Sequence, residues 1–128
     1  MVLLAFLNPL TAGANSHAVA KEVSLIINGK RLVASNIRFS KFDTLDLNAQ
    51  ESIKEKLEAK GVILVITNQR FIAYGVSSGW RDTKTEAGEV VESARVEDFA
   101  AFITTDARFL NFNGETGIWG KRDRRTER

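Results

Sequence analysis

The chain has 128 residues, 44% of them hydrophobic, and its 18 basic and 16 acidic side chains leave a formal net charge of +2. A chain of this length and apolar content is expected to fold as one domain with a packed core, and so small a net charge gives no reason to expect a nucleic acid as partner. The sequence contains no cysteine, which excludes disulfides, thiolate nucleophiles and cysteine-based metal sites.

The first twenty residues differ in composition from the rest of the chain. Residues 1–20 contain no Lys, Arg, Asp or Glu and end at Ala18-Val19-Ala20, a small-x-small pattern typical of signal-peptide cleavage. A basic start is missing, and Asn8-Pro9 limits the initial apolar run to six residues. We expect either an atypical or truncated export signal, which would place the protein in the periplasm or outside the cell, or a first strand of a cytoplasmic protein. A membrane-spanning helix needs about 20 apolar residues, so no membrane span is expected.

A pattern of 38 to 39 residues occurs three times in the rest of the chain. Arg31, Arg70 and Arg108 occupy equivalent positions, and Glu51 upstream matches Glu89. The same register holds for apolar runs at 23–27, 62–66 and 100–104, and for aromatic residues at Phe42, Trp80 and Trp119. One four-stranded antiparallel unit needs about 40 residues. The sequence therefore predicts an all-β fold of three consecutive antiparallel meanders, in units of about 21–49, 50–87 and 88–124 of a single domain at 21–128.

Turn signals place the strands within these units. The continuous apolar run at 62–66 is typical of a strand covered on both faces, and Thr67-Asn68-Gln69 provides the turn after it. In the first unit Asn28-Gly29 predicts a hairpin with a type I′ turn, which needs positive φ at both central residues. A return strand is expected at 71–74, and Trp80 begins a third strand that ends near residues 87–88.

Residues 49–60 have signals for two different structures. Asn48 and Glu51 have the spacing of a helix capping box, and Gly61 is suited to end a helix. Ile53 and Leu57 lie one helical turn apart. The equivalent stretch of the next unit, 89–96, has strand propensity instead. We therefore favour an outer, solvent-facing strand and keep one short helix near 49–60 as the alternative.

The stretch from Arg108 to Trp119 combines a strand, a Gly-containing turn and the Gly117-Ile118-Trp119 strand. This arrangement resembles the inner hairpins of β-propeller blades, and the resemblance implies a propeller-like partial array. Closed propellers have about four to eight blades. Three units therefore imply that a second copy or a partner protein completes the ring, because unpaired blade faces would be apolar.

A weaker resemblance concerns Thr67-Asn68-Gln69-Arg70. This sequence is similar to a turn between strands in bacterial pleckstrin-homology-like and GRAM-type domains, which implies a domain that binds anionic lipid. Those domains end in an amphipathic helix. This chain instead ends in the polar, basic stretch 121–128, which is either a contact for an anionic partner or a solvated end.

Few residues have the chemistry of a catalytic site. The only histidine, His17, lies in the signal-like segment. Carboxylate pairs such as Asp43 and Asp46 have the spacing of solvated groups on a strand or turn. We therefore predict no catalytic residue, no cofactor and no metal site.

The repeated arginines and tryptophans are the candidate ligand-binding residues. A guanidinium at Arg31, Arg70 or Arg108 is suited to bind one small anion in each unit, and Trp80 and Trp119 are suited to be platforms for a glycan or a partner loop. The alternative is structural. The arginines would then pair with backbone carbonyls or with an acid of a neighbouring unit, and the tryptophans would fill the space between units. We favour the structural alternative for both sets.

These observations favour a non-catalytic binding or scaffold module of β-repeat type that is exported and self-associating. A partner protein, a glycan or a small anion are the other ligands considered. Two further functions stay open: a carboxylate-based glycan-processing enzyme or accessory, and an anionic-lipid-binding domain of the pleckstrin-homology-like type.

Overall fold

The computed structural model describes residues 20–124, which fold into eleven strands arranged as three antiparallel sheets. The prediction of an all-β fold with repeated meanders is confirmed. Residues 1–19 of the signal-like segment, including His17, and residues 125–128 of the basic tail lie outside the described residues. The interpretations of those two segments stay predictions.

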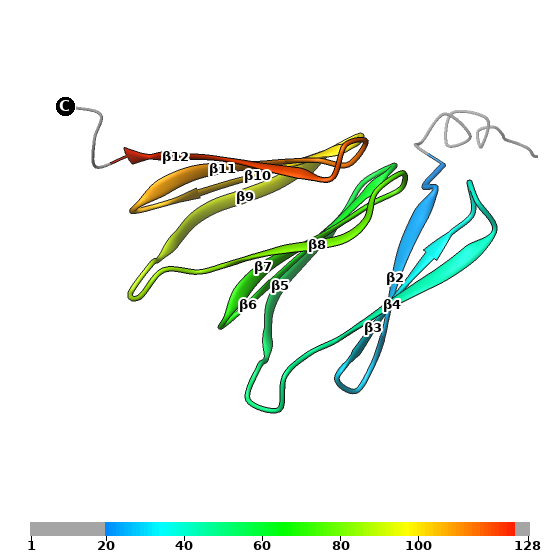
Figure 1. The fold of residues 1–128 in the computed structure, drawn as a ribbon, viewed down its shortest axis with the longest axis horizontal. Coiled ribbons are helices and arrows are strands. Elements are labelled where there is room, and N and C mark those ends of the chain that lie inside the picture. The colour runs from blue at the N-terminus through cyan, green and yellow to red at the C-terminus, as the bar shows by residue number, and fades with distance from the viewer. Residues whose placement is uncertain (1–19, 125–128) are drawn as a thin grey trace, which may run out of the picture.

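Each sheet is a meander of strands that follow one another along the chain (Figure 1). Sheet 1 consists of β2 (Val23–Asn28), β3 (Arg31–Asn36) and β4 (Lys41–Asp46). Sheet 2 consists of β5 (Ile53–Glu58), β6 (Val62–Thr67), β7 (Arg70–Gly75) and β8 (Gly79–Lys84). Sheet 3 consists of β9 (Val91–Glu97), β10 (Ala100–Thr105), β11 (Arg108–Asn113) and β12 (Ile118–Asp123).

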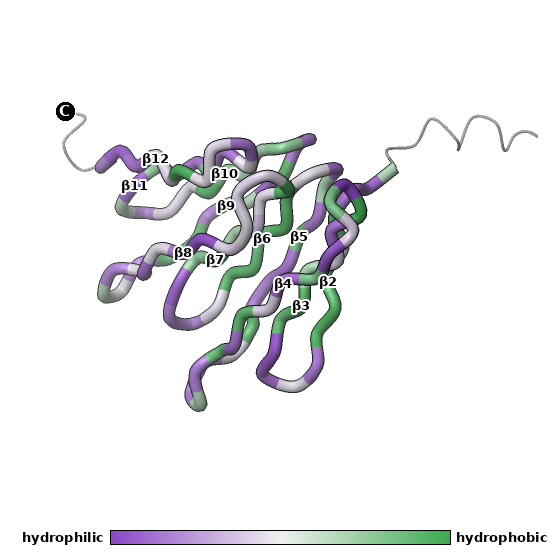
Figure 2. Tube along the Cα trace, turned by 45° about the vertical axis from the view of Figure 1, so that its right-hand side comes forward, coloured by the Kyte–Doolittle hydropathy of each residue, from purple (hydrophilic) through white to green (hydrophobic). Residues whose placement is uncertain are grey.

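The three sheets stack face to face in chain order, with sheet 2 in the middle (Figure 1). One hydrophobic cluster lies between sheets 1 and 2 and another between sheets 2 and 3. Strand β6 supplies both clusters, because Ile63 and Val65 face one of them while Val62, Leu64 and Ile66 face the other. Figure 2 shows this hydrophobic strand in the middle of the stack. All six residues of β6 are buried, so the predicted strand covered on both faces is confirmed.

Residues 53–58 form strand β5, and the alternative of a short helix near 49–60 is wrong. The capping-box contact nevertheless exists, because the Asn48 amide donates to Glu51 Oε1 at 2.9 Å. It closes a tight turn in which the Glu51 amide also donates to the Asn48 carbonyl at 3.1 Å. The chain then becomes extended, because β5 pairs antiparallel with the fully buried β6, with one register shift between Ile53 and Glu55. Tertiary pairing overrides local helix propensity here.

The hairpin between β2 and β3 differs from the predicted turn by one residue. Asn28 pairs with Arg31 as the last residue of β2, so the two central residues of the turn are Gly29 and Lys30. Gly29 has a φ of 62°, whereas Lys30 is not among the described residues with positive φ. The turn therefore needs left-handed backbone only at its first central position, as a type II′ turn does, and the type I′ prediction is wrong.

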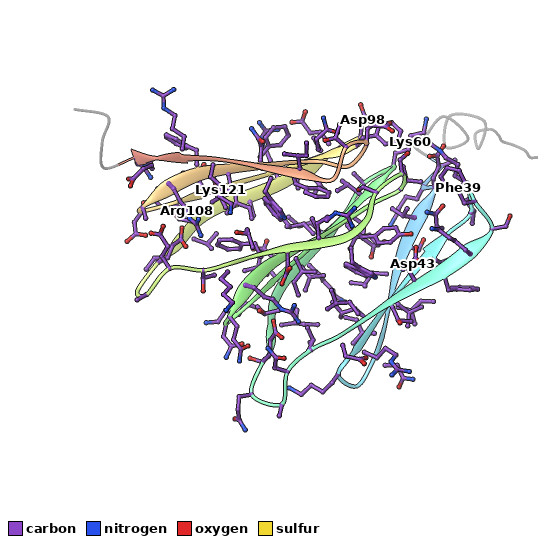
Figure 3. All side chains as sticks on the ribbon, viewed as in Figure 1. Phe39, Asp43, Lys60, Asp98, Arg108 and Lys121 are labelled. Carbon is purple, nitrogen blue, oxygen red and sulfur yellow. The ribbon has the colours of Figure 1, made fainter. Side chains whose placement is uncertain are left out.

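Backbone hydrogen bonds join successive sheets at one end of the stack. The Glu22 amide donates to the Lys60 carbonyl at 2.7 Å, and the Gly61 amide donates to the Asp98 carbonyl at 2.8 Å. Lys60, Asp98 and Phe39 mark this end of the stack in Figure 3. The sheets approach closely there, because a side chain at Gly61 would overlap the Phe99 ring. The same bond thus recurs at both junctions, one repeat apart.

Candidate functional site

Arg70, the central member of the repeated arginines, is held by a buried carboxylate. Its Nε lies 2.8 Å from Glu51 Oε2 and its Nη2 lies 3.0 Å from Glu51 Oε1, a bidentate contact. Thr67 Oγ1 donates to Glu51 Oε2 at 2.7 Å. Glu51 is fully buried and connects the start of the unit to the turn between β6 and β7. We call this arrangement of Glu51, Thr67 and Arg70 an arginine clasp.

A second arginine clasp occurs 38 residues later, with the same atoms in the same roles. Arg108 Nε lies 2.8 Å from Glu89 Oε2, and its Nη2 lies 3.1 Å from Glu89 Oε1. Thr105 Oγ1 donates to Glu89 Oε2 at 2.6 Å. Arg108 lies near the end of sheet 3 opposite to Asp98 (Figure 3). Two units therefore repeat a complete hydrogen-bonded site and not only a residue type.

The turn sequence positions the clasp. Thr67 Oγ1 accepts hydrogen bonds from the amides of Gln69 and Arg70 at 3.1 and 3.0 Å, so the threonine closes the turn while its proton goes to Glu51. Local bonds of this kind favour turns over continued strand. Thr105 accepts from the amides of Ala107 and Arg108 in the same way. The spacing of Thr and Arg is therefore fixed by the turn.

The residue after each threonine ties the turn to the first strand of its own sheet. Asn68 Oδ1 accepts from the Ser52 amide at 2.9 Å, and Asp106 Oδ1 accepts from the Val90 amide at the same distance. Asn and Asp are both suited to this role because each has a short side chain with an accepting oxygen. The Thr, the Asn or Asp, and the Arg of the turn thus each have a structural use in both units.

The clasp sets the ionisation of its carboxylates. Burial by itself would raise the pKa of Glu51, but hydrogen bonds from Arg70, Thr67 and the Asn48 amide outweigh it and lower that pKa to about 2. The pKa of Glu89 is also lowered, because hydrogen bonds from Arg108, the Glu86 amide and Thr105 outweigh the effect of burial. The hydrogen bond to Glu51 in turn raises the pKa of Arg70. Both clasps are therefore charged pairs at neutral pH.

Each clasp also reaches the preceding sheet. Arg70 Nη2 donates to the Asp46 carbonyl of sheet 1 at 3.2 Å, and Arg108 Nη2 donates to the Lys84 carbonyl of sheet 2 at 2.8 Å. Arg70 Nη1 additionally lies 2.8 Å from Asp82 Oδ2. These contacts match the structural alternative for Arg70 and Arg108. The bidentate acid comes from the same unit in both cases, and Arg108 Nη1 also lies 3.9 Å from Glu86 Oε2 of the neighbouring unit. A ligand-binding role for either arginine stays a prediction.

Arg31 differs from the other two arginines. Its Nε lies 2.8 Å from Asp46 Oδ1 across the sheet, and its side chain is 57% exposed. This contact raises the pKa of Arg31 and lowers that of Asp46. The sequence has Ala12 and Gly13 where one repeat length would put the clasp glutamate. Arg31 is therefore the one repeated arginine whose side chain is mostly exposed.

Both candidate tryptophans pack between sheets. Trp80 contacts Tyr74 edge-on, with ring centroids 5.0 Å apart, and its Nε1 donates to the Asp43 carbonyl of sheet 1 at 3.1 Å. Trp119 contacts Phe112 with centroids 5.1 Å apart, and its buried Nε1 has no hydrogen-bond partner among the described residues. Each tryptophan lies against one hydrophobic cluster, which fits a packing role. Binding of a glycan by either ring stays a prediction.

A buried polar network between sheets 1 and 2 was not foreseen from the sequence. The Tyr74 hydroxyl donates to Asp43 Oδ2 at 2.5 Å and accepts from Asn36 Nδ2 at 2.9 Å. Burial, followed by the hydrogen bond to Asp43, raises the pKa of Tyr74 to about 12. The sequence offered one signal, a single tyrosine within a run of apolar residues, but nothing that names its partners in another sheet.

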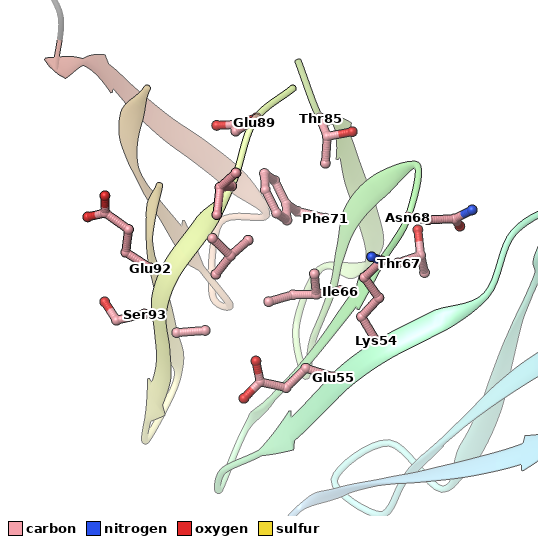
Figure 4. A pocket seen from close by; sticks show the side chains of 13 residues that line it. Lys54, Glu55, Ile66, Thr67, Asn68, Phe71, Thr85, Glu89, Glu92 and Ser93 are labelled. Carbon is pink, nitrogen blue, oxygen red and sulfur yellow. The ribbon is translucent and has the colours of Figure 1, made fainter. Parts of the chain in front are cut away.

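A groove of about 540 Å³ lies between sheets 2 and 3, at the end opposite the inter-sheet backbone bonds (Figure 4). Ile66 and Phe71 form its apolar part. Lys54 and Glu55 from β5 line one side of it, and residues 91–94 of β9 line the other. Its charged lining residues are Lys54 and three glutamates, Glu55, Glu89 and Glu92, of which Glu89 is engaged by Arg108.

The two outer faces of the stack expose apolar side chains. On sheet 1, Ile26 is 48% and Phe42 is 67% exposed, while Val33 beside Ile26 is half-buried. On sheet 3, Phe109 is 44% exposed and Phe102 is half-buried. The equivalent residues of sheet 2 lie in the two inter-sheet clusters: Val65, Ile72 and Trp80 on one side, and Leu64 and Phe71 on the other. Positions that pack against a neighbouring sheet in the middle of the stack are thus accessible at its two ends.

No protein-family model matches the chain, and no curated protein or solved structure shows a significant match to it. Within residues 20–124, no helix has the length and apolar character needed to cross a membrane. In the same part of the chain, no three acidic or histidine side chains are grouped so that they could hold a metal ion.

Proposed function

We propose that the protein is a non-catalytic binding and scaffold module of β-repeat type, and that it associates with a second copy or a partner protein through the outer faces of its sheet stack. One observation carries the proposal. Side chains at equivalent positions are buried between sheets in the middle of the stack but exposed at its ends, notably Phe42 and Phe109. Exposed apolar sheet faces are typical of protein interaction surfaces.

The arrangement of the units supports a propeller-like array. Three meander sheets follow each other along the chain and repeat the same junction, as the blades of a propeller do. Closed arrays contain about four to eight such units. Two chains would bring six sheets together, so self-association is the simplest way for this stack to cover both outer faces.

The repeated polar residues also support a binding role over a catalytic one. Arg70 and Arg108 are engaged by buried carboxylates and by carbonyls of the preceding sheet. These arginines and glutamates connect strands and sheets, and the hydrogen bonds between them lower the pKa values of the two glutamates. The outer faces expose aromatic side chains such as Phe42 and Phe109 among polar ones, and aromatic residues are enriched at interfaces between proteins.

The proposal is tested by measuring the mass of the full chain with size-exclusion chromatography and light scattering over a range of concentrations. We expect a species heavier than the 14.2 kDa chain that is lost on Phe42→Glu or Phe109→Glu. Phe39→Glu is the matched control, because the exposure of Phe39 lies between those of Phe42 and Phe109 but its side chain is in the turn between β3 and β4. A monomer at every concentration would contradict self-association.

We also propose that the protein is exported, on the basis of the uncharged, small-residue composition of residues 1–20. Cell fractionation with sequencing of the mature N-terminus tests this. A periplasmic or secreted chain beginning at Lys21 supports export, and an uncleaved cytoplasmic chain contradicts it.

A further inference from the structure

We infer that two copies of this chain associate head to tail, so that the outer face of sheet 3 in one copy packs on the outer face of sheet 1 in the other. The arrangement would repeat the junction that already joins sheet 1 to sheet 2 and sheet 2 to sheet 3. This inference rests on the proposed function and adds to it the identity of the two faces, their pairing and their register.

The first step is that the two junctions inside the chain use the same bonds. The Glu22 amide, just before β2, donates to the Lys60 carbonyl in the β5–β6 hairpin, and the Gly61 amide of that hairpin donates to the Asp98 carbonyl in the β9–β10 hairpin. One repeat after Gly61, the equivalent donor in sheet 3 is the Phe99 amide. One repeat before Lys60, the equivalent acceptor next to sheet 1 is the Lys21 carbonyl. A second copy placed beyond sheet 3 would bring its Lys21 carbonyl to this amide.

The guanidinium series leads to the same pairing. Arg70 and Arg108 each donate to a carbonyl of the preceding sheet, at Asp46 and Lys84. Asp46 and Lys84 are 38 residues apart, and the same step leads on to the carbonyl of Arg122 in sheet 3. One repeat before Arg70 lies the exposed Arg31, which would donate to the Arg122 carbonyl of the other copy. A carbonyl oxygen has two lone pairs, so it can accept this bond in addition to one within its sheet. Head-to-tail pairing thus gives Arg31 the contact that the other two arginines already make.

The third step is the match between the two faces. Within the stack, Ala73 of sheet 2 and Phe112 of sheet 3 belong to one cluster, as Ala34 and Tyr74 do at the other junction. On the outer face of sheet 3 the equivalent of Ala73 is Asn111, and on the outer face of sheet 1 the equivalent of Tyr74 is Ser35. An amide on one face would therefore meet a hydroxyl on the other, and each can satisfy the hydrogen-bonding need of its partner.

Apolar and polar positions also occur in similar proportion on both faces. Ile26, Val33 and Phe42 on sheet 1 are accompanied by serines, and Phe102 and Phe109 on sheet 3 are accompanied by Thr104 and Asn111. The equivalent positions in sheet 2 are mostly aliphatic or aromatic. Such a mixture is typical of an interface between chains that fold separately and then associate, rather than of a permanent core.

Charge argues against the other arrangements. Arg31 is paired with Asp46 on the sheet 1 face. On the sheet 3 face Arg95 is paired with Glu97, and Arg124, which lies over the Phe109 ring, is paired with Glu92. Arg95 also stacks on Phe102, with its guanidinium carbon 4.2 Å from the ring centroid. Packing sheet 3 on sheet 3 would bring the two Arg95 side chains toward each other, whereas head-to-tail pairing separates them.

Cross-linking tests the pairing directly, because the natural chain contains no cysteine. The full-length variants Ser35→Cys and Asn111→Cys are oxidised separately and as a mixture, with Phe39→Cys replacing either one as the control. We expect a disulfide-linked dimer that forms at least tenfold faster in the mixture of Ser35→Cys with Asn111→Cys than in any other sample. Equally rapid linking of either variant with itself would overturn the head-to-tail arrangement.

Complementation of blocked faces provides the second measurement. Phe42→Glu blocks the face of sheet 1, and Phe109→Glu blocks the face of sheet 3, so we expect each variant alone to be monomeric. Mixing them should restore a complex of twice the monomer mass through the two intact faces. If one variant alone associates as strongly as the natural chain, a face pairs with itself, and the inference fails while the proposed function stands. A natural chain that stays monomeric overturns both this inference and the self-association in the proposed function.

Discussion

Replacing Glu51 by Gln removes the negative charge of an arginine clasp while keeping the size of the side chain. The Arg70 guanidinium would then lie in a half-buried place opposite a neutral amide, and Thr67 and the Asn48 amide would lose their charged acceptor. Arg70 keeps its contact with the exposed Asp82 but loses its buried, bidentate partner, and removing one partner of a buried ion pair is among the more costly single changes in proteins.

The size of the loss follows from the pKa of Glu51. Folding lowers this pKa from 4.5 to about 2. At about 1.4 kcal/mol per pKa unit, the charged form contributes about 3 kcal/mol to the free energy of unfolding at neutral pH. Because the pKa is lower in the folded state, this contribution is complete above about pH 4.5 and is lost as the pH falls toward 2.

Urea unfolding of the full chain at pH 7 and at a series of lower values measures this contribution. We expect Glu51→Gln to lose about 3 kcal/mol at pH 7, and the difference from the natural chain to shrink as the pH falls through this window. Glu55→Gln is the control, because Glu55 is exposed on the adjacent strand and its change should cost less than about 0.5 kcal/mol. A loss that is independent of pH, or that is below about 1 kcal/mol at pH 7, would refute the account of the clasp.

Three further predictions concern the junctions between sheets. Ultraviolet titration of the single tyrosine, Tyr74, should give a midpoint near pH 12 instead of 10, and Tyr74→Phe should cost about 1 to 2 kcal/mol; a midpoint near 10 would contradict the buried contact with Asp43. Gly61→Ala should destabilise the fold by about 1 to 3 kcal/mol through overlap with Phe99, and the penalty should be smaller when Phe99 is already Ala, as a double-mutant cycle of unfolding energies would measure. Trp80→Phe should lower the free energy of unfolding more than Trp119→Phe, by about 1 kcal/mol, because only Trp80 loses a hydrogen bond; equal losses would show that the Trp119 indole has a partner.

The repeat made the fold predictable, because one period carries enough strand and turn signals for a complete meander. The apolar run at 62–66 identified a doubly covered strand correctly, since a residue that faces either neighbouring sheet must be apolar. Residues 49–60 were harder to predict. Asn48 and Glu51 do form the contact of a capping box, but pairing with β6 determines the conformation of the residues that follow.

The sequence identified residues of the arginine clasps but did not predict that they contact one another. Glu51 and Arg70 were both recognised as positions that keep register, but they are 19 residues apart and nothing local links them. The first unit contained the missing signal, because it has Asn28 in place of the clasp threonine and no acid at the clasp glutamate position. Glu and Thr are thus present together in two units and absent together in one, as expected of residues that bind each other.

The contacts of Tyr74 could not be predicted in this way. Asn36 and Asp43 belong to another unit, and no equivalent network recurs one period later, because Phe112 replaces the tyrosine. Contacts that occur once in a repeat protein depend on how two particular units stack. The spacing of equivalent residues in the repeat therefore does not predict such contacts.

The uneven distribution of the clasps implies a gradient of local stability along the stack. Sheets 2 and 3 each contain a buried carboxylate that fixes the turn between their two middle strands, whereas Arg31 of sheet 1 has only an exposed aspartate. In stacked repeats each unit is stabilised by its own contacts and those with its neighbours, so the unit with the weakest contacts opens first. Amide hydrogens of β2 and β3 should therefore exchange with solvent faster than those of β6, β7, β10 and β11, and opening of the stack should begin at sheet 1.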